Sequence, residues 1–255
     1  MKRLADSGKF IATAGEPRKQ LYYELISAGS GLLLALFMWG HLLLVGSILL
    51  GSRSFDWVAG MLEEYSIARP TVVVIIGIFL VHALLASRKI PAQLRERKTM
   101  QQLARRLKEA GLGHPVVQSG YPALQPHLES MLWIWQVRTG MIMLVLGSFH
   151  LILLGLDIYT PLFGTHTGIE AVSSMKRVQL GLWPLYGLLL LCVEFHASVG
   201  LYRLMVKWGP GARMPRTTLR RIEQLMFWLL LGLGILTLVV LAGWLPPPLA
   251  FLTAA

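Results

Sequence analysis

The sequence predicts an all-α membrane protein with five transmembrane helices, and three observations support this fold class. Hydrophobic residues occupy 55% of the 255 positions and charged residues only 15%, whereas an ordinary soluble domain has about a quarter charged residues. The mean hydropathy is +0.58. Apolar runs such as GLLLALFMWGHLLLVGSILLG match the roughly 20 residues that a membrane-spanning helix needs. This composition excludes an ordinary water-soluble fold.

Five apolar segments are expected to form these helices within one membrane domain, 1–255. Lipid-exposed backbone must form its hydrogen bonds internally, and none of the runs alternates as a barrel strand does, so each is interpreted as a helix. The prolines of the tail WLPPPLAFLTAA are expected to end the last helix. No internal repeat of fixed period is apparent. The expected segments are 25–51, 71–90, 131–156, 180–206 and 223–245.

Lysine and arginine predict the orientation, because cytoplasmic loops are enriched in these residues. The N-terminal segment has five of them, the second loop eight and the fourth loop six. The first and third loops together have four, counting Arg53, Arg69, Lys176 and Arg177. The N-terminus and the second and fourth loops are therefore expected in the cytoplasm.

The second loop, PAQLRERKTMQQLARRLKEAG, is basic and could form a short amphipathic helix. One interpretation is a solvated connection between two membrane helices. The other is a docking surface for soluble partners or anionic headgroups. The sequence does not separate the two.

Four of the seven histidines lie inside apolar segments, one on each of the first four helices. Ionisable residues are costly inside a membrane and are by default candidates for function. With the predicted orientation, two histidines lie in the outer half of the membrane and two in the inner half, separated by roughly 10 Å along the membrane normal. The outer two are His41 and His150, and the inner two are His82 and His196.

Two histidine pairs at two depths suit two haems, each held by an imidazole on either side of its iron. Zinc also binds histidine, but it favours four ligands that converge on one point. The sequence has no Cys-x-x-Cys-His motif, so the haems are expected to be non-covalent and b-type. Iron with both axial positions filled has no open site for substrate, which suits electron transfer. The single cysteine, Cys192, excludes an iron–sulfur cluster ligated by this chain alone and is interpreted as inert packing.

Haem propionates need cationic or hydrogen-bonding neighbours. Arg203 and Lys207 follow His196 on the same helical face and are candidates for the inner haem, although they could equally serve as cytoplasmic anchors of the helix. Lys176 and Arg177 are weaker candidates for the outer haem.

At this point the chain resembles the dihaem cytochrome b membrane anchor of bacterial quinol:fumarate reductase and succinate dehydrogenase. The resemblance rests on LFMWGH, VHALLASRKIP, MLWIWQVRTG with GSFH, and WPLYGLLLLCVEFHASVGLYRLMVKWG. It implies that His82 and His196 ligate a proximal haem and that His41 and His150 ligate a distal one.

The resemblance also implies roles for residues other than the histidines. An acidic residue essential for menaquinol oxidation falls on Glu63, with Glu64 as the adjacent alternative. A second acid, linked to proton transfer, falls on Glu194. Positions near haem propionates match Trp133, Lys207 and Lys176, the last of which replaces an arginine of some relatives.

Both acids also have interpretations that do not depend on the family. Glu194 lies deep in an apolar segment, where burial favours an uncharged carboxyl, so it could relay protons or act only as a packing partner. Glu63 lies at the outer interface, where a carboxylate could accept a quinol proton or simply be solvated. His166 is interpreted as a surface residue, and a role in proton exchange is considered as an alternative for His166 or Glu170.

The predicted function is that of the membrane anchor of fumarate reductase or succinate dehydrogenase in the bacterial cytoplasmic membrane. Menaquinol would be oxidised near the outer face, and electrons would pass through two haem b groups to an iron–sulfur subunit, with an FAD-containing flavoprotein beside it. A dimer of heterotrimers is suggested by the resemblance, and no nucleic acid is expected as a partner. Two alternatives remain: a dihaem cytochrome b of another respiratory enzyme, or a haem-free transporter of protons or metal.

Overall fold

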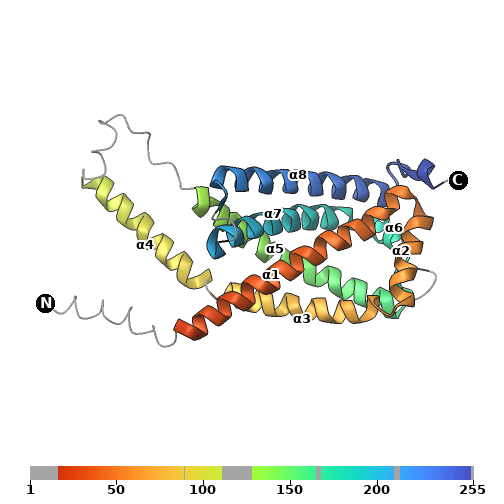
Figure 1. Ribbon diagram of the computed structural model, residues 1–255, viewed down its shortest axis with the longest axis horizontal. Helices are drawn as coiled ribbons and strands as arrows, with labels where there is room; N and C mark the ends of the chain where they lie inside the picture. Colours follow the sequence, from red (N-terminus) through yellow and green to blue (C-terminus); the bar gives the residue numbers. More distant parts are fainter. Residues whose placement is uncertain (1–16, 89, 111–127, 165–167, 210–212, 254–255) are drawn as a thin grey trace.

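Five long apolar helices form the body of the molecule, as a computed structural model shows for residues 17–88, 90–110, 128–164, 168–209 and 213–253 (Figure 1). All five are long and apolar enough to cross a membrane, which confirms the expected fold class. They are α1 (Pro17–Gly46), α3 (Ala68–Ser87), α5 (Leu128–Tyr159), α7 (Trp183–Trp208) and α8 (Arg216–Leu241).

The expected helix boundaries were wrong at several ends, because polar residues continue a helix beyond its apolar part. The first helix begins at Pro17 rather than near residue 25, with proline in the first turn, where its missing N–H is not needed. The third helix extends to Tyr159 and so includes Asp157, which lay outside the expected segment. The second helix is shifted towards the N-terminus, over Ala68–Ser87 instead of 71–90.

The last helix ends at Leu241, before the prolines that were expected to stop it. Gly243 has a φ of 75°, the left-handed conformation common after a helix. Its N–H donates to the carbonyl of Val240 at 3.0 Å, and the N–H of Trp244 donates to that of Val239 at 3.1 Å. These two bonds form a Schellman motif, which terminates the helix without the prolines.

The fourth apolar segment is divided into pieces. Helix α6 (Ala171–Arg177) leads into a wide helical turn, η3 (Val178–Leu182), in which Gly181 breaks the helix with a φ of 102°. Helix α7 then starts at Trp183, with Pro184 in its first turn. The expected continuous helix over 180–206 therefore begins three residues later.

Four of the membrane helices form a bundle, and the fifth packs on its outside. Helix α1 packs closely on α3, and α5 packs closely on α7, while the contacts between these two pairs are sparser. Helix α8 lies against α7 and α1 (Figure 1). Large apolar side chains such as Leu43, Leu84 and Trp228 are exposed on the outside, as expected for a lipid-facing surface.

Short helices cover one end of the bundle. These are η2 (Ser47–Leu50), α2 (Ser52–Glu64), α6 and η5 (Ala250–Leu252). Helix α2 was not expected from the sequence, because it is short and amphipathic. It buries Phe55 and Ala59 in a cluster that also includes Ile48 and Val240.

The basic loop after α3 is helical over α4 (Ile90–Glu109), which extends away from the bundle at the opposite end (Figure 1). This end also contains the start of α8, so the basic segments that the structure describes gather on one side. A second, smaller packed cluster lies near this end and contains Leu132, Val199, Tyr202 and Leu219. The two clusters leave the histidine-bearing middle of the bundle between them.

Candidate functional site: two histidine pairs

The structure brings the four intramembrane histidines together in the two expected pairs. The rings of His82 on α3 and His196 on α7 have centroids 6.3 Å apart, with ring planes 86° apart. The rings of His41 on α1 and His150 on α5 have centroids 6.4 Å apart, with planes 52° apart. We call these the inner pair and the outer pair.

The separation within each pair is compatible with a metal ion shared by the two rings. A metal–imidazole bond is about 2 Å long and a ring nitrogen lies about 1.1 Å from its ring centre, so two imidazoles on one metal have centroids about 6.3 Å apart. Among the described residues, no three His, Cys, Asp or Glu side chains converge on a metal position. Each pair thus offers two ligands, which fits an iron that takes its other ligands from a porphyrin.

The rings of the inner pair are held by backbone carbonyls of the facing helices. The Nδ1 of His82 lies 3.1 Å from the carbonyl oxygen of Ser27, and the Nδ1 of His196 lies 2.9 Å from that of Gln136. A carbonyl oxygen only accepts hydrogen bonds, so each Nδ1 carries the hydrogen. The Nε2 lone pair of each ring is therefore available to a metal.

The outer pair is surrounded by aromatic rings. Phe37 stacks on His41 with centroids 5.8 Å apart, and Tyr186 meets His150 edge-on at 5.5 Å. The buried Nδ1 of His150 has no hydrogen-bond partner among the described residues. Both rings of the outer pair therefore lie against aromatic side chains.

Of the two cations considered for the inner haem, Arg203 lies beside the inner pair. Arg203 is half-buried and donates to the side-chain oxygen of Gln136 at 2.6 Å, so Gln136 contacts both His196 and this arginine. Lys207 is exposed and forms an ion pair with Glu24 of α1. Trp133 is half-buried on α5, and no polar contact of its indole is seen within the described residues.

Of the two outer cations, Arg177 and not Lys176 reaches the interior. Lys176 is exposed on α6. Arg177 is buried, forms an ion pair with Asp157 and donates to the hydroxyl of Ser174 at 3.0 Å. The other oxygen of Asp157 accepts a hydrogen bond from the N–H of Phe163 at 2.9 Å.

Glu194 is 2% exposed on α7, and its Oε2 has no hydrogen-bond partner in the described part of the chain. The two other buried carboxylates, Asp157 and Glu223, are both paired with an arginine. The indole of Trp39 on α1 lies close to Glu194. Glu194 therefore differs from the other buried acids in lacking a cation.

Glu63 is exposed at the end of α2 and bound to the outer loop. Its Oε1 accepts a hydrogen bond from the N–H of Ile169 at 2.8 Å. Asp56, on the same helix, accepts one from the N–H of Ala171 at 2.7 Å. Both acids thus anchor α2 to the segment that leads into α6. Glu64 is also exposed, and His166 lies outside the described residues.

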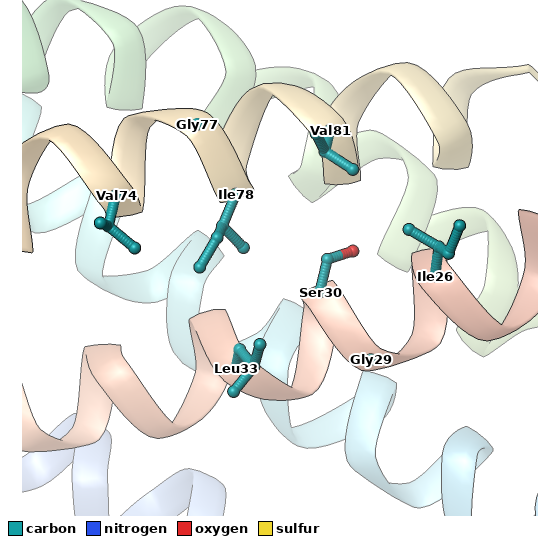
Figure 2. A pocket seen from close by; sticks show the side chains of 8 residues that line it. All are labelled: Ile26, Gly29, Ser30, Leu33, Val74, Gly77, Ile78 and Val81. Carbon is teal, nitrogen blue, oxygen red and sulfur yellow. The ribbon is translucent and has the colours of Figure 1, made fainter.

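An open apolar groove of about 560 Å³ runs between α1 and α3 beside the inner pair. Figure 2 shows Ile26, Ser30 and Leu33 of α1 facing Val74, Ile78 and Val81 of α3. The hydroxyl of Ser30 also lies 3.3 Å from the Nδ1 of His82. Ser30 is thus part of both the groove and the surroundings of the inner pair.

The sequence did not single out Ser30, Thr139, Gln136 or Asp157. Ser30, Thr139 and Gln136 contact histidines that lie more than fifty positions away in the sequence. Such polar residues are common at helix contacts in membranes, so their presence alone indicates no site. One signal was present: both α1 and α5 have a hydroxyl residue followed by glycine before their histidine.

Comparison with known proteins places this geometry in context. Residues 120–242 match the family described as succinate dehydrogenase/fumarate reductase transmembrane subunit. The fumarate reductase cytochrome b subunit of Wolinella succinogenes is 35% identical over 222 residues, which cover 82% of this chain and 77% of that protein. The subunit of the same name from Helicobacter pylori is 32% identical, over 89% of this chain and 84% of that protein. The succinate dehydrogenase hydrophobic membrane anchor subunit of Archaeoglobus fulgidus is 33% identical over 34% of this chain and 68% of that protein.

Proposed function

Because the chain belongs to the family of succinate dehydrogenase/fumarate reductase transmembrane subunits, we propose that it oxidises menaquinol near the outer face and delivers electrons across the membrane. The chain is a membrane protein and a cytochrome b anchor subunit of a redox-enzyme complex. The observation that supports the proposal most directly is the presence of two imidazole pairs with metal-sharing separations of 6.3 and 6.4 Å.

Two b-type haems are the cofactors that these pairs fit. His82 and His196 would hold the inner one, and His41 and His150 the outer one. When bound, such haems supply one-electron carriers at two depths, with no open site for substrate. Arg203 and Lys207 would contact propionates of the inner haem together with Trp133, and Arg177 is better placed than Lys176 to serve the outer one.

Glu63 is the proposed acceptor of a menaquinol proton. The N–H of Ile169 holds Oε1 in position, which leaves Oε2 to meet a quinol hydroxyl at the outer interface. Electrons leave a quinol only as its protons are removed, so a fixed carboxylate at this place would assist the first step. Glu64, the next residue of α2, is the alternative proton acceptor.

Glu194 is the proposed site of proton uptake within the membrane. A buried carboxyl without a cation is most stable when it is protonated, and a nearby change of charge can release or bind its proton. On α7 it lies between Tyr186, which contacts His150 of the outer pair, and His196 of the inner pair.

The partners follow from the family and from the charge distribution. An iron–sulfur subunit and an FAD-containing flavoprotein would bind the basic end, which faces the cytoplasm of a bacterial cell. Dicarboxylate chemistry would occur on the flavoprotein, so fumarate reduction and succinate oxidation use the same parts of this chain. Two such three-subunit assemblies would form a dimer.

The experiment that tests this proposal compares Glu63→Gln with Glu64→Gln in the assembled complex. Glutamine keeps an oxygen for the N–H of Ile169 but cannot take a proton. We expect Glu63→Gln to abolish oxidation of a water-soluble naphthoquinol while dithionite-reduced spectra still show both haems. Full activity of Glu63→Gln, or its loss only in Glu64→Gln, would contradict the assignment.

The same purified complex distinguishes the proposed function from its two alternatives. A purified wild-type complex without the α-band of a b-type cytochrome would favour a haem-free transporter. Co-purification with hydrogenase or formate dehydrogenase subunits would favour a cytochrome b of another respiratory enzyme.

A further inference from the structure

Helices α1 and α5 have the same arrangement of residues along their length. In α1, Ser27 is followed by Ser30, Gly31 and then His41. In α5, Gln136 is followed at the same three spacings by Thr139, Gly140 and then His150. The last residue of each series belongs to the outer pair, and the first three residues contact the inner pair. No fixed-period repeat was expected from the sequence, and the correspondence becomes apparent through these contacts.

In the first copy, α1 surrounds the Nδ1 side of His82. The carbonyl of Ser27 lies 3.1 Å from this nitrogen, and the hydroxyl of Ser30 lies 3.3 Å from it. The same hydroxyl donates to the carbonyl of Ser27 at 3.1 Å. A Cβ on Gly31 would lie 2.8 Å from Cε1 of His82, which is closer than side-chain carbons approach one another.

The second copy repeats these contacts on the other half of the bundle. The carbonyl of Gln136 lies 2.9 Å from the Nδ1 of His196, and the hydroxyl of Thr139 lies 3.5 Å from it. That hydroxyl lies 2.8 Å from the carbonyl oxygen of Trp135 and 3.1 Å from that of Gln136, so its hydrogen is shared between two carbonyls of α5. A Cβ on Gly140 would lie 2.9 Å from Cε1 of His196.

We propose that Ser30–Gly31 and Thr139–Gly140 are two copies of one ligand clamp, which sets the ring orientation and tautomer of the inner axial histidines. The glycine lets the imidazole lie directly on the helix backbone. The carbonyl and the hydroxyl then surround Nδ1–H, so the lone pair of Nε2 stays available to a metal. Metal-bound histidines generally need such a partner for their second nitrogen, and it makes the ligand a stronger donor.

The clamp distinguishes the inner pair from the outer pair. The Nδ1 of His150 lacks a hydrogen-bond partner in the described residues, and a Cβ on Gly147, one turn before it, would meet Phe79 at 3.8 Å rather than a histidine ring. Changes in the clamp should therefore affect the inner haem alone. This inference rests on the proposed haem function, and the experiments below distinguish failure of one from failure of the other.

The first experiment adds a methyl group at each clamp glycine of the full chain, expressed with its partner subunits. In Gly31→Ala and in Gly140→Ala, the new Cβ must displace the ring of His82 or His196. We expect haem per chain to fall from two to one, with loss of the same low-spin ferric signal in the electron paramagnetic resonance spectrum. The matched controls are Gly29→Ala on α1 and Gly155→Ala on α5, where a Cβ would meet no atom within 4 Å. Both controls should keep two haems.

The second experiment keeps the ring in place and changes only its hydrogen bond. Ser30→Ala and Thr139→Val remove the hydroxyl, and we expect both haems to remain while the g values and midpoint potential of the inner one shift. Ser30→Thr and Thr139→Ser retain a hydroxyl and should restore the wild-type signals. A role in packing alone would not produce this pattern of loss and rescue, and these variants decide the matter if the alanine-for-glycine proteins fail to accumulate.

Three outcomes would overturn an inference. Wild-type protein without haem would overturn the proposed function itself. If the wild-type protein binds two haems, unchanged spectra of the glycine variants would overturn the clamp. A change confined to the outer haem in any of these variants would also overturn it.

Discussion

The inner and outer histidine pairs have nearly the same ring separation but are held by different means. The inner rings donate to backbone carbonyls of α1 and α5, so the helices themselves fix their orientation. The outer rings lie among aromatic side chains, beside a buried ion pair between Asp157 and Arg177. The comparison shows that one bundle can surround two similar histidine pairs in different ways, with backbone carbonyls at one pair and aromatic side chains at the other.

The two ends of the helix bundle also differ from each other. The outer end is closed by α2 and α6, which are attached through Asp56 and Glu63. The inner end has exposed cations and the extended helix α4. These two different surfaces suit the proposed function, in which a quinol would enter from the membrane and a soluble partner would bind from the cytoplasm.

The largest expected effect comes from removing one ligand of each pair. His41→Ala and His150→Ala should lose the same haem, and His82→Ala and His196→Ala should lose the other, because in the proposed function the rings of each pair would share one metal. Reduced-minus-oxidised spectra and haem quantitation measure this loss. If His41→Ala and His82→Ala removed the same spectral component, the pairing would be wrong.

The buried ion pair at the outer end gives the next largest effect. Asp157→Asn leaves the Arg177 guanidinium buried without its counter-charge, which typically costs about 3–5 kcal/mol. We expect a lower thermal unfolding temperature and loss of the outer haem before the inner one during heating. Glu96→Gln, which changes an exposed carboxylate of α4, should leave both unaffected. Equal stability of the two variants would show that the ion pair does not support the outer end.

These effects also show what the sequence could and could not predict. The fold class was confirmed, because apolar length alone identifies a membrane helix. The intramembrane histidines and Glu194 were noticeable because ionisable groups are rare in apolar segments. The roles of these residues stay predictions, although the structure brings the rings together.

Other features depend on contacts that a linear pattern does not contain. Ser30 and Thr139 are ordinary residues for a membrane helix, and only the packing of α1 on α3 and of α5 on α7 gives them a role. Asp157 was missed because the helix extends beyond its apolar part. Lys176 and Arg177 are adjacent in sequence, so their opposite exposures depend on how α6 lies against the bundle.

Substitutions of a buried and a half-buried tyrosine, one near each histidine pair, should have effects of intermediate size. Tyr202, near the inner end, donates to Glu129 at 2.6 Å, and a hydrogen bond to a charged group is worth about 1.5–3 kcal/mol. Tyr202→Phe should therefore lower the free energy of unfolding by about this amount. The hydroxyl of Tyr186, beside His150, has no partner among the described residues, so Tyr186→Phe should be neutral or slightly stabilising. Unfolding in a graded denaturing detergent measures both, and a larger loss for Tyr186→Phe would indicate that its hydroxyl binds something at the outer pair.

The smallest expected effect concerns Lys207 at the inner surface. Its side chain is 52% exposed and pairs with Glu24, and such exposed ion pairs contribute about 0–1 kcal/mol. Lys207→Gln should therefore barely change the thermal unfolding temperature. If Lys207 also contacts a propionate of the inner haem, the same variant should alter the midpoint potential of that haem and leave the outer one unchanged, because a cation favours the more negative, reduced state. A redox titration that shows two unchanged potentials would limit Lys207 to its ion pair, whereas a change in the outer potential alone would contradict the assignment of this lysine to the inner end.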